Sequence, residues 1–295
     1  MDKNIMEKKQ VFVGTISATD SNPNGDRDNN GAPRQNMLTG RGEISDACFK
    51  RWLRETLCRM FDNVELYIDS DRPMNEKTSE AVAEAAGMTL DELMKAMKKD
   101  RNAFLPVQEY LFNRYYDIRA FGAVLANLNR AIKGPVQAAI SLSVLPVDLK
   151  TFALTSKGIA TAKQFYEDGS NTMFGEKTVV RHGLYIIRGE ISAVQAAETG
   201  FTEEDKDMLF QAMAHMFDFN KSAARADMRL HDLYNFEYPD RLGLEPPTHV
   251  LWDAVKVTPV PEVLDGTRPA TQYSDYIVAL DESVIPDAIT VHKLV

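Results

Sequence analysis

One extended segment near the N-terminus does most to constrain the fold of this 295-residue chain. If residues 10–19 form a strand, apolar side chains fall on both of its faces. They are Val11 and Val13 on one face, and Phe12 and Ile16 on the other. Such a strand needs sheet neighbours and packed layers on both sides, which predicts a central position in a sheet. The 44% hydrophobic content is enough for a core of that kind.

The remaining elements suggest an α+β fold. Ser45 opens an amphipathic helix that reaches about Met60, and Thr202 caps a second helix through Phe219. Apolar and β-branched runs predict further strands, at 64–68, 134–147, 183–191 and 248–257, with a weaker one at 273–279. Without its insertions the order is strand, helix, strand, strand, helix, strand. This order predicts the ferredoxin-like or RRM-like split βαβ arrangement, as a single domain over 1–295.

Three less regular stretches interrupt that order. Residues from about 70 to 115 are charged and helix-prone, with a capping box at 89–92, and predict a helical insertion. Residues from about 148 to 182 are polar and irregular and predict a protruding loop or hairpin. The loop 20–33 is rich in Asn, Gly, Pro and Asp. A loop of that length inside a compact domain is usually functional or disordered.

The distribution of charge leaves room for a nucleic-acid partner. The net charge of −9 argues against one, because nucleic-acid-binding domains are usually basic. The field near a groove nevertheless depends on where the charges sit. Acidic residues concentrate in 65–92, 198–207 and 237–287. Basic residues form two clusters elsewhere: Lys50, Arg51 and Arg54 in the first predicted helix, and Lys221, Arg225 and Arg229 at i, i+4 and i+8.

Each basic cluster has two interpretations. Basic side chains along one helix can reach successive phosphates. Alternatively, Glu43 or Glu55 pairs with the first cluster on a solvated face, which would contribute little to stability. The second cluster forms one basic row only if 221–229 is helical. The residues alone leave both interpretations open.

No motif in the chain indicates a cofactor or a catalytic centre. Asp20, Asp26 and Asp28 could bind Mg²⁺ for phosphodiester cleavage, although Asp and Asn also cap turns in such loops. The five histidines lack metal-ligand spacing, and His215 falls near the core face of its helix, which predicts a packed histidine. A nucleophile elbow, a P-loop and a dinucleotide fingerprint are all missing from the sequence. We therefore expect a binding protein without a cofactor.

The segment Arg119-Ala-Phe-Gly-Ala-Val124 faintly resembles the RNP1 pattern of an RRM. Its first Gly and second aromatic residue are missing. Two interpretations follow. Phe121 could stack on a base, or it could be buried beside a tight turn at Gly122, and the second interpretation is favoured.

Cysteine usage and hydropathy favour a cytoplasmic protein. Cys48 and Cys58 fall about three turns apart in one predicted helix, too far to bridge each other, and we expect both to be buried thiols. No apolar run approaches the roughly 20 residues of a membrane helix. Residues 1–10 have no apolar core of a secretory signal.

Six regions of the sequence, taken in order, resemble one known family. The motifs are Asn22-Pro-Asn-Gly-Asp26 with Asn29-Asn-Gly-Ala-Pro-Arg34, Asp117-Ile-Arg-Ala-Phe-Gly-Ala-Val124, Gly134-Pro-Val-Gln137, Gly183-Leu-Tyr185, Ser222-Ala-Ala-Arg225 and Leu233-Tyr-Asn-Phe236. Together they resemble the Cascade backbone subunit of type I-C CRISPR systems, a Csd-type member of the Cas-seven superfamily. Any one motif is weak, but six in order span nearly the whole chain.

The resemblance implies a fold and a set of partners. The fold would be a modified RRM palm with helical fingers at about 62–116 and an extended thumb at about 148–182. Copies would stack head to tail along the crRNA spacer, hold its phosphates without reading bases, and present it to a target DNA strand. Further partners would be the crRNA-processing end-capping subunit and the large and small subunits. The chain would be non-catalytic and would not bind a membrane.

The resemblance also assigns RNA-binding roles to individual residues. Those of the opening loop and first helix are Asn22, Asn24, Arg34, Lys50, Arg51 and Arg54, followed by Arg119 of the Phe-Gly motif. Those of the thumb are Met173 and Phe174 as candidate wedges between bases, with Lys177, Arg181 and His182 near its base. Those after the second helix are Ser222, Arg225 and Arg229. The rival hypothesis is a metal-dependent ribonuclease that uses Asp20 or Asp26, as in type III backbone subunits.

Overall fold

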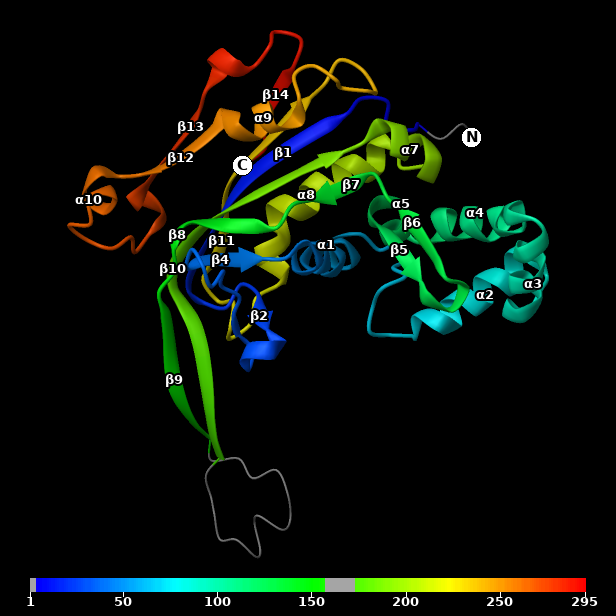
Figure 1. The fold of residues 1–295 in the computed structure, drawn as a ribbon, viewed down its shortest axis with the longest axis horizontal. Helices are drawn as coiled ribbons and strands as arrows, with labels where there is room; N and C mark the ends of the chain where they lie inside the picture. The colour runs from blue at the N-terminus through cyan, green and yellow to red at the C-terminus, as the bar shows by residue number, and fades with distance from the viewer. Residues whose placement is uncertain (1–3, 157–172) are drawn as a thin grey trace, which may run out of the picture.

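An antiparallel sheet forms the centre of the computed structural model, which describes residues 4–156 and 173–295 (Figure 1). The strand order is β14-β11-β1-β10-β8-β4. β1 (Gln10–Ser21) lies in the middle, between β10 (Met173–Ile191) and β11 (Met228–Glu237). The outer strands are β8 (Ser141–Pro146), β4 (Arg41–Ile44) and β14 (Thr290–Lys293), and β7 (Val136–Ala138) pairs with the end of β10. The predicted central strand and the mixed α/β fold are therefore confirmed.

Two long helices cover one face of this sheet. They are α1 (Asp46–Met60) and α8 (Glu203–Phe219), with the short α7 (Ala193–Thr199) beside them. The Phe12 ring of β1 lies 6.4 Å from the rings of both Phe49 and Phe210, so it packs against both helices. Trp52 and Phe217 join the two helices edge to face at 5.3 Å. The predicted caps are confirmed, since Ser45 Oγ accepts from the backbone of α1 and Thr202 opens α8 with a capping box.

The C-terminal part of the chain covers the other face of the sheet. It contains α9 (Thr248–Ala254), the hairpin of β12 (Val255–Pro259) and β13 (Tyr276–Leu280), and α10 (Pro261–Leu264). Val11 and Val13 of β1 pack there against Phe236 and Leu251. Both faces of β1 are thus buried, as its sequence predicts.

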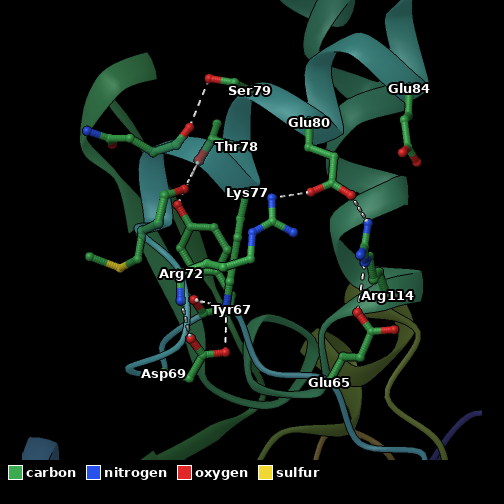
Figure 2. A network of polar contacts seen from close by, with 12 residues as sticks. Glu65, Tyr67, Asp69, Arg72, Lys77, Thr78, Ser79, Glu80, Glu84 and Arg114 are labelled. Atoms are coloured by element: carbon green, nitrogen blue, oxygen red, sulfur yellow. Dashed lines mark hydrogen bonds and ion pairs between the residues drawn. The ribbon is translucent and has the colours of Figure 1, made fainter.

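The predicted helical insertion is present and has its own apolar core. It consists of α2 (Met74–Ala86), α3 (Leu90–Lys99), α4 (Leu105–Arg114) and α5 (Tyr116–Phe121), followed by a hairpin of β5 (Gly122–Leu125) and β6 (Arg130–Lys133). Figure 2 shows the polar contacts that hold its first turns. Arg114 donates to Glu65 at 2.8 Å and to Glu80 at 2.7 Å, and Arg72 contacts the other oxygen of Glu80 at 2.7 Å. None of the helices in the described part of the chain is long and apolar enough to span a membrane.

A long hairpin projects from the sheet in a different direction from the insertion (Figure 1). Its strands are β9 (Leu149–Ser156) and the first half of β10. β10 is one continuous 19-residue strand. The described parts of the stretch 148–182 therefore form a regular hairpin, one of the two predicted alternatives, and are not irregular. Residues 157–172, between the two strands in sequence, lie outside the described residues.

Four predicted elements need correction. Residues 64–68 form only an isolated bridge at Glu65, and the run 134–147 splits into β7 and β8. The run 248–257 begins as α9, a helix that directly follows two prolines, and only its end is a strand. The loop 20–33 contains a small hairpin of β2 (Gly25–Asp26) and β3 (Ala32–Pro33). β11, a neighbour of the central strand, was not predicted.

Candidate nucleic-acid interface

Three segments that are distant in sequence meet at the C-terminal end of β1. The backbone N–H of Asn22 donates to the carbonyl of Ala224 at 2.6 Å, which ties the opening loop to the turn before β11. The backbone N–H of Ser45 donates to Asn24 Oδ1 at 2.8 Å, which ties the same loop to the start of α1. Asn22 and Asn24, both predicted to bind RNA, therefore also hold this junction together.

Three arginines, one from each segment, act electrostatically on a single thiol at the junction. Burial raises the pKa of Cys48 to about 11, and the positive charges of Arg51, Arg225 and Arg34 act in the opposite direction on that pKa. Burial prevails, so Cys48 remains a protonated thiol. We refer to Arg34, Arg51 and Arg225 as the arginine cluster. Each of the three was assigned to RNA binding from the sequence.

The arginine cluster is held by weak contacts. Arg51 is 57% exposed and contacts Glu55 at 2.7 Å, and Arg34 is 39% exposed and contacts Asp26 at 3.1 Å. Arg225 donates to the carbonyl of Asn220 at 3.3 Å. Exposed ion pairs of this kind contribute about 0–1 kcal/mol, so a phosphate can replace the carboxylates at little cost.

Further polar side chains border the arginine cluster. Lys177 of β10 donates to the carbonyl of Ala223, which attaches the root of the long hairpin to the junction. Ser222 and Lys221 are exposed on the same turn. This turn is not helical, so the condition for a single basic row of Lys221, Arg225 and Arg229 is not met.

Two predicted RNA-binding arginines are engaged inside the protein. Arg54 is 11% exposed and its Nε donates at 2.9 Å to Asp117, which is itself 1% exposed. Arg119 binds both carboxylate oxygens of Asp205, at 2.9 and 2.7 Å, and the carbonyl of Phe112 at 2.7 Å. Both guanidinium groups therefore hold the insertion against the core, and we remove them from the interface.

Lys50 differs both from the arginine cluster and from the two arginines that bind buried carboxylates. Its Nζ lies 3.6 Å from Asp46 and 6.0 Å from the centre of the Phe121 ring. Burial lowers the pKa of Lys50. The side chain is only 13% exposed, so it can contribute charge to the junction but little direct contact.

The remaining predicted contacts have partners of their own within the protein. His182 is buried with its Nδ1 2.8 Å from Thr19 Oγ1, and Arg181 contacts Asp148 at 2.7 Å. Arg229 belongs to β11 and contacts Asp227 at 2.9 Å. The backbones of Met173 and Phe174 pair with β9, and their side chains are outside the described part of the structure.

Comparison with known proteins identifies the family. The model of the family "CRISPR-associated protein Cas7" matches residues 8–281. The chain belongs to the Cas7 family.

Two solved structures are similar at low identity. One, titled "CRISPR RNA-guided surveillance complex, pre-nicking", has a TM-score of 0.44 and 14% identity over 78% of each chain. The other, "CRISPR RNA-guided surveillance complex", has a TM-score of 0.41 and 15% identity over 78% of this chain and 68% of that chain. No curated protein matches.

The aromatic residue of the RNP1-like segment is not available to a base in this Cas7-family chain. Phe121 is 6% exposed and lies 5.2 Å from the Arg54 guanidinium. The following Gly122 has a φ of +78°, which glycine adopts without strain. A buried Phe121 beside a tight turn is therefore the correct interpretation.

The acidic and histidine residues are placed as follows. Asp26 accepts a hydrogen bond from the backbone of Asp28 and pairs with Arg34, which is the turn chemistry considered above. Within residues 4–156 and 173–295, no group of three or more His, Cys, Asp and Glu could hold a metal ion. His215 contacts Asp218 at 2.9 Å and is 55% exposed, so its predicted packing in the core was wrong. Cys58 is also exposed, contrary to prediction.

Proposed function

We propose that this Cas7-family chain is a non-catalytic, guide-RNA-binding backbone subunit of a type I-C Cascade complex. Copies would line up head to tail along the crRNA spacer and leave its bases free to pair with target DNA. The observation that carries the proposal is the arginine cluster, where three exposed or half-buried guanidinium groups from separate segments converge. Family membership supports it independently.

The sheet supports a modified RRM palm in this proposal. The order β11-β1-β10-β8, with α1 and α8 on one face, is that of a split βαβ unit. An RRM stacks bases on the sheet face away from its helices. Here α9, β12 and β13 cover that face, so the RNA would lie at the end of β1, where the arginine cluster is. The fingers would be the helical insertion, and the thumb would be the β9–β10 hairpin.

The chemistry of the cluster fits a subunit that ignores sequence. Guanidinium groups bind phosphate oxygens through a planar fork of N–H donors. Phosphate contacts fix position on the strand but carry no sequence information. The net charge of −9 does not oppose this role, because local positive charge decides the field at the cluster.

The proposal includes partners and a location. The partners are crRNA, a target DNA strand paired with it, further copies of the chain, the crRNA-processing end-capping subunit and the large and small subunits. The complex would act in the cytoplasm. No cofactor is required for phosphate binding of this kind.

Charge removal at the arginine cluster tests RNA binding. We expect Arg34→Ala/Arg51→Ala/Arg225→Ala to weaken binding of a mixed-sequence single-stranded RNA, measured by fluorescence anisotropy across a salt series. Each lost phosphate contact lowers the slope of log K against log salt by about 0.7, so the slope should fall by about 2. Lys95→Ala/Lys98→Ala/Lys99→Ala removes the same charge from exposed positions of α3 and serves as the control. An unchanged slope, or an equal loss in the control, would refute the proposed interface.

The absence of catalysis needs a separate test. Asp20→Ala and Asp26→Ala should leave bound RNA as intact as it is with the wild-type chain, in the presence of Mg²⁺. Metal-dependent cleavage by the wild type that disappears in either variant would replace the proposal with the ribonuclease hypothesis.

A further inference from the structure

A groove of about 460 Å³ lies between α8 and the last strand of the sheet, β14. On the helix side it is lined by a stripe of α8 that runs from Lys206 to His215. Within this stripe Phe210, which is 8% exposed, supplies an apolar wall. On the sheet side the lining residues come from β11, β14 and the position directly after β14: Asn235, Glu237, His292 and Leu294. None of the three members of the arginine cluster lines the groove, so it is a separate site.

β14 leaves one edge of the sheet open beside this groove. The backbone N–H of Leu294 donates to the carbonyl of Leu233 at 2.8 Å, at the end of the antiparallel pairing of β14 with β11. Residues of such a pair alternate in direction, so the backbone N–H and C=O groups of Val291 and Lys293 point away from β11. Within residues 4–156 and 173–295 these outward groups have no backbone partner. An edge lysine often guards such a strand, but the Lys293 ammonium lies 3.3 Å from Asp232 of β11 and is directed over the sheet.

Asn235 presents an unused hydrogen-bond acceptor at the groove. The residue is 5% exposed, and its Nδ2 donates to Gln10 Oε1 at 2.8 Å. Its Oδ1 is buried and has no hydrogen-bond partner among the described residues. A buried acceptor without a partner costs about 1–3 kcal/mol, which an N–H donor on a ligand would offset.

The groove keeps a negative charge of its own at Glu237. This carboxylate accepts hydrogen bonds from Lys8 at 2.7 Å and from Gln10 at 3.3 Å. Burial acts to raise the pKa of Glu237, but the two hydrogen bonds outweigh burial and lower that pKa. Glu237 is therefore ionised near neutral pH.

The charge balance of the groove favours a cation, even when the ion-pair partners outside the groove are counted. The ammonium groups belong to Lys206 in the groove and to Lys8, the partner of Glu237. The carboxylates belong to Asp207 and Glu237 in the groove, to Glu203, the partner of Lys206, and to Asp218, the partner of His215. With the histidines neutral, two negative charges remain in excess. Asp207 is 67% exposed, so it can meet a cation while it stays largely solvated.

We propose that this groove and the free edge of β14 together bind a basic, extended segment of a partner protein. The segment adds a strand beside β14 through the outward backbone groups of Val291 and Lys293, and a Lys or Arg side chain enters the groove. The alkyl stem of that side chain packs on Phe210, and its N–H donors meet Asn235 Oδ1 and Asp207. Strand addition at a sheet edge, with a pocket for alternate side chains, is a recurring mode of peptide recognition. The inference does not depend on the proposed RNA interface.

The test uses the full-length chain and a fluorescent seven-residue peptide that alternates Thr and Lys, with Thr at both ends. Binding is measured by fluorescence anisotropy at about 0.15 M salt, where distant surface charges are largely screened. Hydrogen exchange of the Val291 and Lys293 amides is followed by NMR of the ¹⁵N-labelled protein. We expect saturable binding that slows the exchange of both amides at least about tenfold, because both become hydrogen-bonded. The same peptide with Glu in place of Lys should not bind.

Matched variants separate the groove from the general acidity of the chain. Asp207→Lys reverses an exposed charge in the groove and should weaken peptide binding at least about fivefold. Glu109→Lys reverses an exposed charge on α4 and should leave binding unchanged. Arg34→Ala/Arg51→Ala/Arg225→Ala should also leave it unchanged, so failure of the RNA interface and failure of this inference are distinguishable.

Changes in the peptide test strand addition without altering the protein. One peptide is N-methylated at every Thr and another at every Lys. Because only one edge of an added strand faces β14, we expect one of these peptides to lose binding and the other to retain it. The inference is overturned if both bind as well as the unmodified peptide, or if exchange at Val291 and Lys293 does not slow. It is also overturned if Asp207→Lys binds like the wild type, or if the two amides become protected without peptide as the protein concentration rises, which would indicate a second copy.

Discussion

Arg54 and Arg51 lie three residues apart on α1, yet we predict that replacing the first lowers fold stability and replacing the second weakens RNA binding. Arg54 donates to a carboxylate that is 1% exposed, whereas Arg51 is 57% exposed and pairs with Glu55 one turn away. Arg54→Ala should therefore destabilise the fold, whereas Arg51→Ala should affect RNA binding and leave stability nearly unchanged.

The structure sets the size of the Arg54 effect. Removing one partner of a buried ion pair costs about 3–5 kcal/mol, because the remaining charge stays buried without compensation. Asp117 keeps two backbone donors, Tyr67 N at 2.7 Å and Ile68 N at 3.0 Å. The cost should therefore fall near the lower end of that range, at about 3 kcal/mol. For Arg51→Ala, an i,i+4 pair on a helix surface contributes only about 0.3–0.5 kcal/mol.

Urea unfolding followed by circular dichroism measures both variants, and RNA anisotropy on the same preparations measures affinity. The reasoning would be refuted if Arg54→Ala lost less than about 1 kcal/mol of unfolding free energy, well below the cost of an uncompensated buried charge. It would equally be refuted if Arg54→Ala remained stable but lost RNA affinity as strongly as Arg51→Ala. Arg54 would then have to be counted as an RNA contact despite its burial.

Two further predictions concern positions outside the arginine cluster. Gly122→Ala places a Cβ 2.2 Å from the carbonyl oxygen of Ile132 at a φ of +78°, so it should cost about 2 kcal/mol or more in urea unfolding. Because burial holds the folded pKa of His182 below 6.5, its contribution to stability is complete above pH 6.5 and is lost as the pH falls, by up to about 1.4 kcal/mol per pH unit. Urea midpoints between pH 7.5 and 5.5, for the wild type and His182→Gln, should show a smaller decline in the variant. An equal decline of the urea midpoint in the wild type and in His182→Gln would contradict the predicted contribution of His182.

Local patterns predicted the elements that depend on local chemistry. The two-sided apolar strand, the Ser45 and Thr202 caps and the capping box at Thr89 all appear where the sequence indicates. Each of them depends on residues within a few positions of one another. The central sheet strand and the two covering helices could therefore be placed before the structure was known.

Long-range partners could not be predicted in the same way. β11 was missed because His231, Asp232 and Asn235 make its sequence look polar, whereas the structure engages them with Ser17, Thr15 and Gln10 of β1. Such partners are more than 200 residues away, and no periodicity reveals them. The same holds for Arg54. A helical projection places it among basic neighbours, but Asp117 reaches it from the insertion, 63 residues later.

Burial, rather than total charge, determines which cations of this acidic chain can meet an anion. Arg54 and Arg119 each bind a buried carboxylate, so their charge is already compensated and a phosphate would have to displace a strong partner. Arg34 and Arg51 hold half-buried carboxylates that remain in contact with water, so water and salt already weaken these pairs. Lys50 and Arg54 also lie beside the same Phe121 ring. The internal Arg54–Asp117 pair therefore lies on the same helix from which Arg51 projects. Loss of the Arg54–Asp117 pair should therefore lower stability, whereas loss of the arginine cluster should leave that pair intact.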